Sequence, residues 1–299
     1  MIFLLPRRRP TIPGPKQSDL EKQSDLKNPG NLKVLLDGLY REVNKPDFIP
    51  KDPVQFPHRY KNRKDREIAA FLAATIAWGR RDLILKSAEK LFALMGKSPY
   101  DFVMKSGFPE TQARNGGGAK ASGFSASRKR MCIHRTFFED DFHYFCRGFK
   151  ACYAKFENLE KLFASAPDIW EGISLFRETM AAANSIAGRG PAKEPRYSKH
   201  LSNPEAGSAC KRLNLALRWL VRQEGPVDLG VWKNISPASL FIPLDLHVGR
   251  SARELGLLDS GRQANDKKAV ISLTEKLRAF CPEDPIKYDL ALFGYSVYR

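Results

Sequence analysis

Two residues, Lys211 and Asp245, have the types and settings that nucleophilic catalysis on a nucleotide would need. Lys211 lies in the segment ACKRLNLAL among small and apolar neighbours, and Asp245 ends the apolar run FIPLD before an amphipathic helical pattern. An amine held against apolar surface can become neutral and act as a nucleophile. An aspartate at a helix start is oriented by backbone amides, and its charge can stabilise an oxocarbenium-like state or activate the amine. The pair would suit attack on the C1′ carbon of a nucleotide sugar.

Both residues also have plainer interpretations. Lys211 could be a phosphate contact or a surface lysine whose stem lies on apolar neighbours. Asp245 could be an N-cap that stabilises its helix by about 1 kcal/mol. Capping and catalysis are compatible in one aspartate, so both roles stay open.

The segment before Lys211 predicts a helix N-terminus that binds phosphate. Asn203-Pro204 initiates a turn, Gly207 permits a backbone bend, and Ser208 can cap the helix that follows. Backbone amides and the helix dipole favour an anion at such a place. The predicted phosphate contacts are Gly207, Ser208, Arg212 and Arg218. The helix, predicted over 208–222, has one apolar face and an opposite face that carries Lys211, Arg218 and Arg222.

The overall charge indicates an anionic partner. Lysine and arginine number 50 against 33 acidic residues, a formal net charge of +17. Nucleic acid is the first partner that such an excess suggests, and an anionic membrane surface the second. The five cysteines are scattered without zinc or iron–sulfur spacing, so we expect reduced thiols, no metal and no cofactor. No apolar run is long enough for a membrane span, and the expected location is the cytoplasm, at the nucleoid.

The hydrophobic patterning predicts an all-α fold. Helical spacing recurs along the chain, whereas alternating β-branched stretches are almost absent. Helices are predicted over 31–43, 65–96 with a turn near 78–81, 138–156, 169–186, 208–222, from Asp245 onward, 267–280 and 284–299. Residues 1–30 are predicted to form a flexible basic tail, and 110–130 and 188–200 to form basic loops.

Two motifs resemble the helix-hairpin-helix DNA glycosylase superfamily, which includes endonuclease III. The segment IPLDLHVGRSARELGL is similar to the family pattern [VI]-[AP]-V-D-x-H-[VI]-x-R around the catalytic aspartate. The segment CKRLNLAL is similar to K-x-x-N-x-x-L, in which the lysine of bifunctional members forms a Schiff base. The resemblance spans about residues 65–299, with large insertions. The chain looks like a member of a poorly characterised bacterial family that distantly resembles the archaeal 8-oxoguanine DNA glycosylases.

The resemblance implies a fold, a reaction and a partner. Two helical subdomains would enclose a catalytic cleft: 60–225 with the hairpin and Lys211, and 31–59 plus 226–299 with Asp245. A monomeric DNA N-glycosylase with AP-lyase activity would act on double-stranded DNA containing a damaged base, an 8-oxoguanine-like purine, or an abasic site. Lys211 would be the nucleophile and Asp245 its electrostatic partner. Trp78 would line the base pocket, with core packing as its plainer role. His247 and Arg250 would contact DNA, with a structural histidine as the plainer role of His247. His134 and Arg135 have no role that the sequence indicates.

Three departures from the family pattern are visible in the sequence. Ala206 and Ala209 stand where the usual hairpin has a proline and a second glycine, which puts the phosphate contact in doubt. Lys211 and Asp245 are 34 residues apart, more than in endonuclease III. The iron–sulfur cysteines that follow the aspartate in endonuclease III are missing. A non-catalytic helix-hairpin-helix protein that binds nucleic acid is therefore the alternative.

Overall fold

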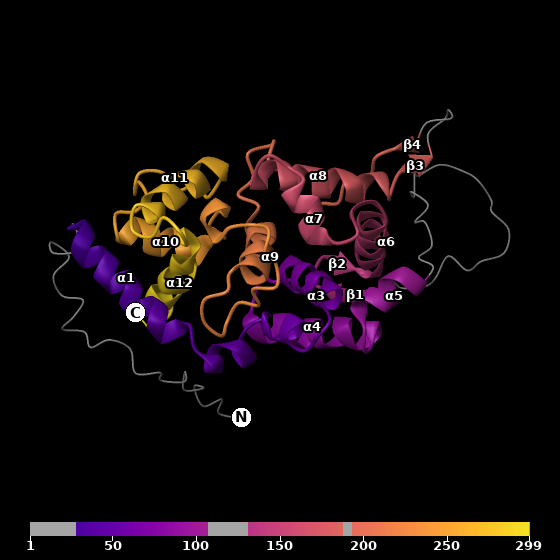
Figure 1. Ribbon diagram of the computed structural model, residues 1–299, viewed down its shortest axis with the longest axis horizontal. Helices are drawn as coiled ribbons and strands as arrows, with labels where there is room; N and C mark the ends of the chain where they lie inside the picture. The colour runs from indigo at the N-terminus through magenta and orange to yellow at the C-terminus, as the bar shows by residue number, and fades with distance from the viewer. Residues whose placement is uncertain (1–27, 107–130, 188–192, 299) are drawn as a thin grey trace, which may run out of the picture.

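The computed structural model describes residues 28–106, 131–187 and 193–298 (Figure 1). Most of the predicted tail, the loop 110–130 and part of the loop 188–200 lie outside these ranges. Within them the fold is all-α, as predicted, with two short antiparallel ribbons, β1 (Cys132–His134) with β2 (Phe137–Phe138) and β3 (Ile186–Ala187) with β4 (Lys193–Glu194). The helices are α1 (Pro29–Val43), α2 (Gln55–His58), α3 (Arg63–Thr75), α4 (Arg81–Met95), α5 (Pro99–Lys105), α6 (Glu139–Phe156), α7 (Leu159–Ala164), α8 (Ile169–Ala182), α9 (Lys211–Val221), α10 (Leu246–Glu254), α11 (Lys267–Arg278) and α12 (Tyr288–Tyr298), with 3-10 turns η3 (Pro46–Lys51), η4 (Pro237–Ser239) and η5 (Pro285–Lys287).

One group of helices joins the two ends of the described chain. α1 packs along α12, α12 packs on α10, and α11 contacts η5 (Figure 1). The predicted helix over 31–43 is confirmed, because Leu32, Leu36 and Leu39 are buried on one side of α1. Pro46 opens the 3-10 turn that follows.

The second group is built around α3, which is buried on nearly all sides. Its alanines (Ala69, Ala70, Ala73 and Ala74) are fully buried and allow neighbouring helices to approach closely. α2, α5 and α9 pack on α3, while α6 packs on α7 and α8. The predicted break near 78–81 is confirmed, since α3 ends at Thr75 and α4 begins at Arg81.

The two groups of packed helices do not divide the chain at the predicted subdomain boundaries. α2 lies within the predicted range 31–59 but packs on α3 and α4. Trp232 lies beyond residue 226, yet its indole contacts Phe71 and Phe163, and its Nε1 donates to Glu67 Oε1 over 2.9 Å. The chain after α9 therefore returns into the α3 group before it crosses to α10. α9 lies between the two groups in Figure 1.

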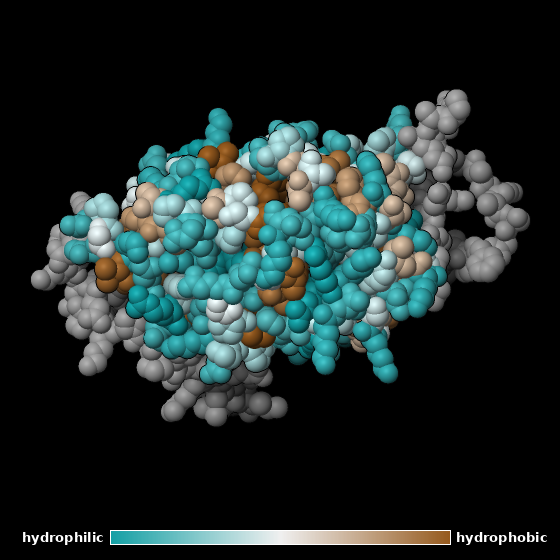
Figure 2. Space-filling model, viewed as in Figure 1, coloured by the Kyte–Doolittle hydropathy of each residue, from teal (hydrophilic) through white to brown (hydrophobic). Residues whose placement is uncertain are grey.

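The surface is predominantly polar in the view of Figure 2, with smaller apolar patches. The ranges that the structure describes contain no helix with the length and apolar character of a membrane span.

Candidate active site

Lys211 and Asp245 lie side by side at the starts of two helices. Asp245 is the N-cap of α10, and its Oδ1 accepts a hydrogen bond from the Val248 amide over 2.8 Å. Its Oδ2 lies 3.5 Å from Lys211 Nζ, at the first residue of α9. The predicted capping role is thus confirmed, and it engages one carboxylate oxygen while the other faces the amine. Asn265 also holds the backbone of Asp245 in place, because its Nδ2 donates to the Asp245 carbonyl over 2.8 Å.

The local backbone places Lys211 at the helix start, and the prediction that it lies one turn inside is wrong. Cys210 adopts a left-handed conformation with φ 47°, so the helix cannot begin before Lys211. Ser208 consequently does not cap α9 as predicted; its Oγ accepts from the Cys210 amide over 3.3 Å and closes the turn. The bend at Gly207 is confirmed by a φ of 77°. The segment 195–202 that leads into this turn is irregular rather than helical.

A cavity of about 380 Å³ opens beside the Lys211 side chain. Its lining combines Trp78 after α3, the turn from Ala206 to Arg212, and Leu244, Asn265 and Asp266 from the other helix group. Volumes of this order are typical of small-molecule sites. Lys211 lines this cavity, whereas Asp245 lies outside the lining and is placed beside it by its contact with Lys211. The two side chains are 28% and 30% exposed.

Trp78 forms an aromatic wall of this cavity and is held there by two histidines. Its ring stacks on His200, with centroids 5.6 Å apart, and meets the edge of His134 at 4.7 Å. His134 Nε2 donates to the Trp78 carbonyl over 2.9 Å, and its Nδ1 lies 2.9 Å from Ser87 Oγ. Burial lowers the pKa of His134, which favours this neutral form. Trp78 thus packs and lines the cavity at once, and His134 gains a role that the sequence did not indicate.

The two predicted arginine contacts on α9 are directed inward. Arg212 lines the cavity, but its Nη1 donates to the Thr75 carbonyl over 2.9 Å and its guanidinium lies 5.1 Å from the Trp78 ring centre. Arg218 is only 3% exposed and forms ion pairs with Asp228 and Asp289, so its assignment as a phosphate contact is wrong. On the basic face of α9 and its C-cap, Arg218 and Arg222 are buried and are paired with carboxylates from elsewhere in the chain, whereas Lys211 stays partly exposed.

The remaining predicted contacts lie around the site. Gly207 and Ser208 line the cavity. His247 and Arg250 are exposed on α10, the helix that Asp245 caps, and lie outside the cavity lining; His247 Nδ1 is 3.2 Å from Ser296 Oγ. Leu246, directly after Asp245, is 79% exposed.

Two further carboxylates influence the site and were not identified from the sequence. Burial raises the pKa of Asp289 to about 6; Arg218 and Lys211 oppose this, and the negative charge of Asp245 adds to it. Burial also raises the pKa of Asp52, against the positive charges of Arg81, Arg218 and Lys211. A signal for Asp289 was present, because it is an acid directly beside the apolar run LALFGY, and Asp245 likewise adjoins an apolar run.

Comparison with known proteins gives a family and no function. A family model described as a protein of unknown function (DUF2400) matches residues 52–298. Searches found no matching curated protein and no matching solved structure.

Proposed function

The chain belongs to the DUF2400 family, whose function is unknown, and we propose that this member is a DNA N-glycosylase with AP-lyase activity. The observation that carries the proposal is the 3.5 Å approach of Lys211 Nζ to Asp245 Oδ2 beside a cavity. One of the two glycosylase-like motifs marks Lys211 and the other marks Asp245. The two residues lie on helices of different groups.

The pair has the groups that the reaction requires. The Lys211 amine would form a bond to C1′ while the glycosidic C1′–N bond breaks and its electron pair leaves with the base. A proton would pass from the amine through Asp245 to the departing base. Opening of the sugar ring would then convert the amine–C1′ bond into an imine. Asp245 would also stabilise the positive charge that develops at C1′.

The cavity supports an extruded nucleotide as substrate. C1′ cannot be reached inside a stacked duplex, so the nucleotide must leave the helix. Trp78 lines the cavity in which the base would lie, and the Gly207–Ser208 turn offers backbone beside it. A purine such as 8-oxoguanine remains the favoured base from the family resemblance. The net charge of +17 favours a DNA partner.

Borohydride trapping tests the proposal directly. The protein is incubated with a duplex containing 8-oxoguanine, and separately with an abasic duplex, in the presence of borohydride, which reduces an imine to a stable adduct. We expect an adduct that is lost in Lys211→Ala and slowed about 100-fold or more in Asp245→Asn.

A second lysine provides the matched control. Lys267 begins α11 next to the cavity residue Asp266, and Lys267→Ala should still give the adduct. An adduct with the abasic duplex alone would support the lyase chemistry and leave the base unassigned. Tight, salt-sensitive duplex binding without any adduct would refute the enzyme and favour the non-catalytic binding protein.

A further inference from the structure

The turn between β1 and β2 presents an exposed arginine in an unusual backbone conformation. Arg135 has a φ of 51°, in the left-handed region, which is uncommon for residues other than glycine. The pairing of β1 with β2 also shifts register between Cys132 and His134, just before this residue. Such irregularities re-aim a side chain, and backbone strain persists only where the surrounding structure imposes it. The conformation of Arg135 therefore calls for a reason in its surroundings.

The neighbours of Arg135 are anchored on both sides. His134 Nε2 donates to the Trp78 carbonyl over 2.9 Å, and His200 Nε2 lies 3.2 Å from the Thr136 carbonyl. The rings of both histidines also pack against the ring of Trp78. The backbone of Arg135 is thus fixed relative to the aromatic wall of the cavity, and its side chain projects from a rigid turn.

The Arg135 guanidinium has neither a hydrogen bond nor an ion pair with any residue that the structure describes. It lies over Gly79, because a Cβ added there would come within 2.5 Å of Arg135 Nη1. Glycine therefore leaves the room that the guanidinium occupies. Arg80, the next residue, is also exposed but pairs with Asp82 over 2.8 Å. Arg135 thus differs from this neighbouring arginine in lacking a counterion.

The corner formed by residues 77–79 connects Arg135 to the candidate site. Lys211 Nζ donates to the Ala77 carbonyl over 3.4 Å, and Trp78 lines the cavity. Neighbouring Cα atoms are about 3.8 Å apart, so Gly79 lies within roughly 8 Å of Ala77. Lys211 and Arg135 therefore contact the two ends of one short corner. A DNA strand that delivers a nucleotide to Lys211 carries a phosphate on either side of that nucleotide.

We propose that Arg135 binds a phosphate of the DNA strand next to the nucleotide that enters the cavity. A guanidinium presents its N–H donors in a planar fork that matches two phosphate oxygens, and the phosphate supplies the counterion that Arg135 lacks. The left-handed turn holds this fork beside the Trp78 wall. The assignment rests on DNA as the partner in the proposed function, but it does not require the glycosylase reaction.

Duplex binding by the full chain tests the proposal. Fluorescence anisotropy is measured with a duplex that carries a tetrahydrofuran abasic-site analogue, which cannot form an imine. We expect Arg135→Asn to weaken binding about tenfold and to lower the slope of log K against log salt by about 0.9, the contribution of one phosphate. Arg135→Lys, which retains the charge, should keep a slope near the wild-type value. The loss should be the same whichever base lies beside the analogue, because phosphates carry no sequence information.

Arg41→Gln is the matched control. Arg41 is an exposed arginine of α1, in the other helix group, and it also has no ion pair with the described residues (Figure 1). Its substitution should change the affinity less than about twofold, because exposed charges beyond a Debye length are screened. A salt slope that is the same in Arg135→Asn and the wild type would overturn the proposal, and so would a loss confined to one neighbouring base.

The melting temperature separates binding from a structural role. Asparagine adopts the left-handed conformation more readily than arginine, so Arg135→Asn should melt no lower than the wild type. Weaker binding together with a lower melting temperature would assign Arg135 to folding and overturn the proposal. Binding that depends on Arg135, without an adduct in borohydride trapping, would refute the glycosylase and leave the phosphate contact in place.

Discussion

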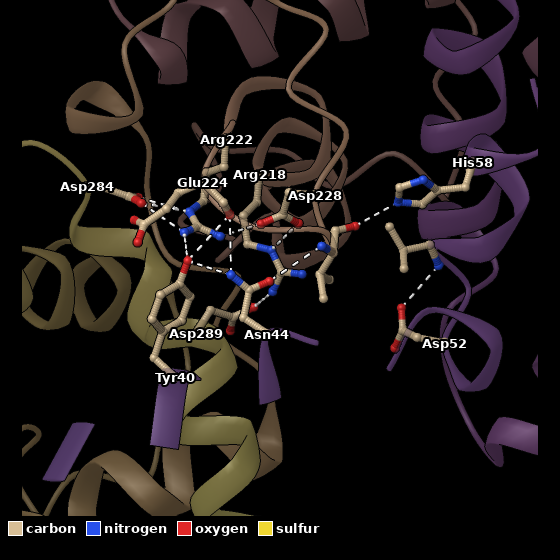
Figure 3. A network of polar contacts seen from close by, with 12 residues as sticks. Tyr40, Asn44, Asp52, His58, Arg218, Arg222, Glu224, Asp228, Asp284 and Asp289 are labelled. Carbon is tan, nitrogen blue, oxygen red and sulfur yellow. Dashed lines mark hydrogen bonds and ion pairs between the residues drawn. The ribbon is translucent and has the colours of Figure 1, made fainter. Parts of the chain in front are cut away.

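Replacement of Arg222 by methionine should destabilise the protein strongly. The Arg222 side chain is fully buried, and its guanidinium donates to Asp284 at 2.8–3.0 Å, to Asp228, and to Tyr40 Oη over 3.0 Å (Figure 3). Burial alone would lower the pKa of Arg222, but the two carboxylates raise it above its usual range. Methionine retains most of the volume and removes the charge.

The expected loss can be estimated from the two carboxylates that remain. Removing one partner of a buried ion pair costs about 3–5 kcal/mol, because the other charge stays uncompensated. Asp228 retains Arg218, so Asp284, at 8% exposure, is the group left with the largest deficit. We therefore expect a decrease of about 3–5 kcal/mol in the free energy of unfolding at pH 7, a large share of the roughly 5–15 kcal/mol typical of folded proteins.

Urea denaturation at pH 7 measures this loss in the free energy of unfolding. Arg41→Met, an exposed substitution on α1, should change stability by less than about 0.5 kcal/mol. A loss below about 1 kcal/mol at pH 7 would contradict the conclusion that Arg222 compensates the buried charges of Asp228 and Asp284.

Three other substitutions test local features of the structure. Gly148→Ala should lower the free energy of unfolding by about 1–3 kcal/mol, because a Cβ there would lie 2.2 Å from Met180 Sδ and 3.2 Å from Met180 Cα. Unchanged stability in thermal or urea unfolding would contradict the close approach of α6 and α8. Glu157→Gly should stabilise by about 0.5–1 kcal/mol, since Glu157 has a φ of 67° at the end of α6; a lower melting temperature would refute this. Burial raises the pKa of Asp289 to about 6, so ionisation of Asp289 between about pH 4 and pH 6 disfavours the folded state of the wild type. The stability of Asp289→Asn should therefore increase relative to that of the wild type as the pH rises through this window. Urea titrations that show a constant difference in stability would contradict this prediction.

The sequence predicted the elements that depend on local patterning. The apolar run before Asp245 and the amphipathic pattern after it indicate a capped helix, and the cap is present with a 2.8 Å hydrogen bond. The alanine-rich stretch predicted a buried helix followed by a break, which the structure confirms between α3 and α4. These features are decided within a few turns of chain, so hydrophobic spacing and capping chemistry suffice to find them.

The sequence did not predict where the basic face of α9 points. A row of basic residues opposite an apolar face has the same pattern whether its counterions are solvent, phosphates or carboxylates of the same chain. Here the counterions lie far along the chain, at Asp284 and Asp289. The start of α9 was also misplaced, because Cys210 has a φ of 47°, a conformation that is uncommon for residues other than glycine and that its residue type does not predict.

The burial of this basic face changes which surface could meet DNA. Arg218 and Arg222 are neutralised inside the protein, so they cannot supply the positive potential that a phosphate backbone requires. The Gly207–Ser208 turn and the exposed residues His247 and Arg250 remain, and they flank the starts of the same two helices that carry Lys211 and Asp245. If the proposed glycosylase reaction occurs, the duplex must approach the starts of α9 and α10, because the partly exposed Lys211–Asp245 pair lies there. Substitution of Arg250 should then weaken duplex binding and its salt dependence, whereas the effects of Arg218 and Arg222 should appear first in stability.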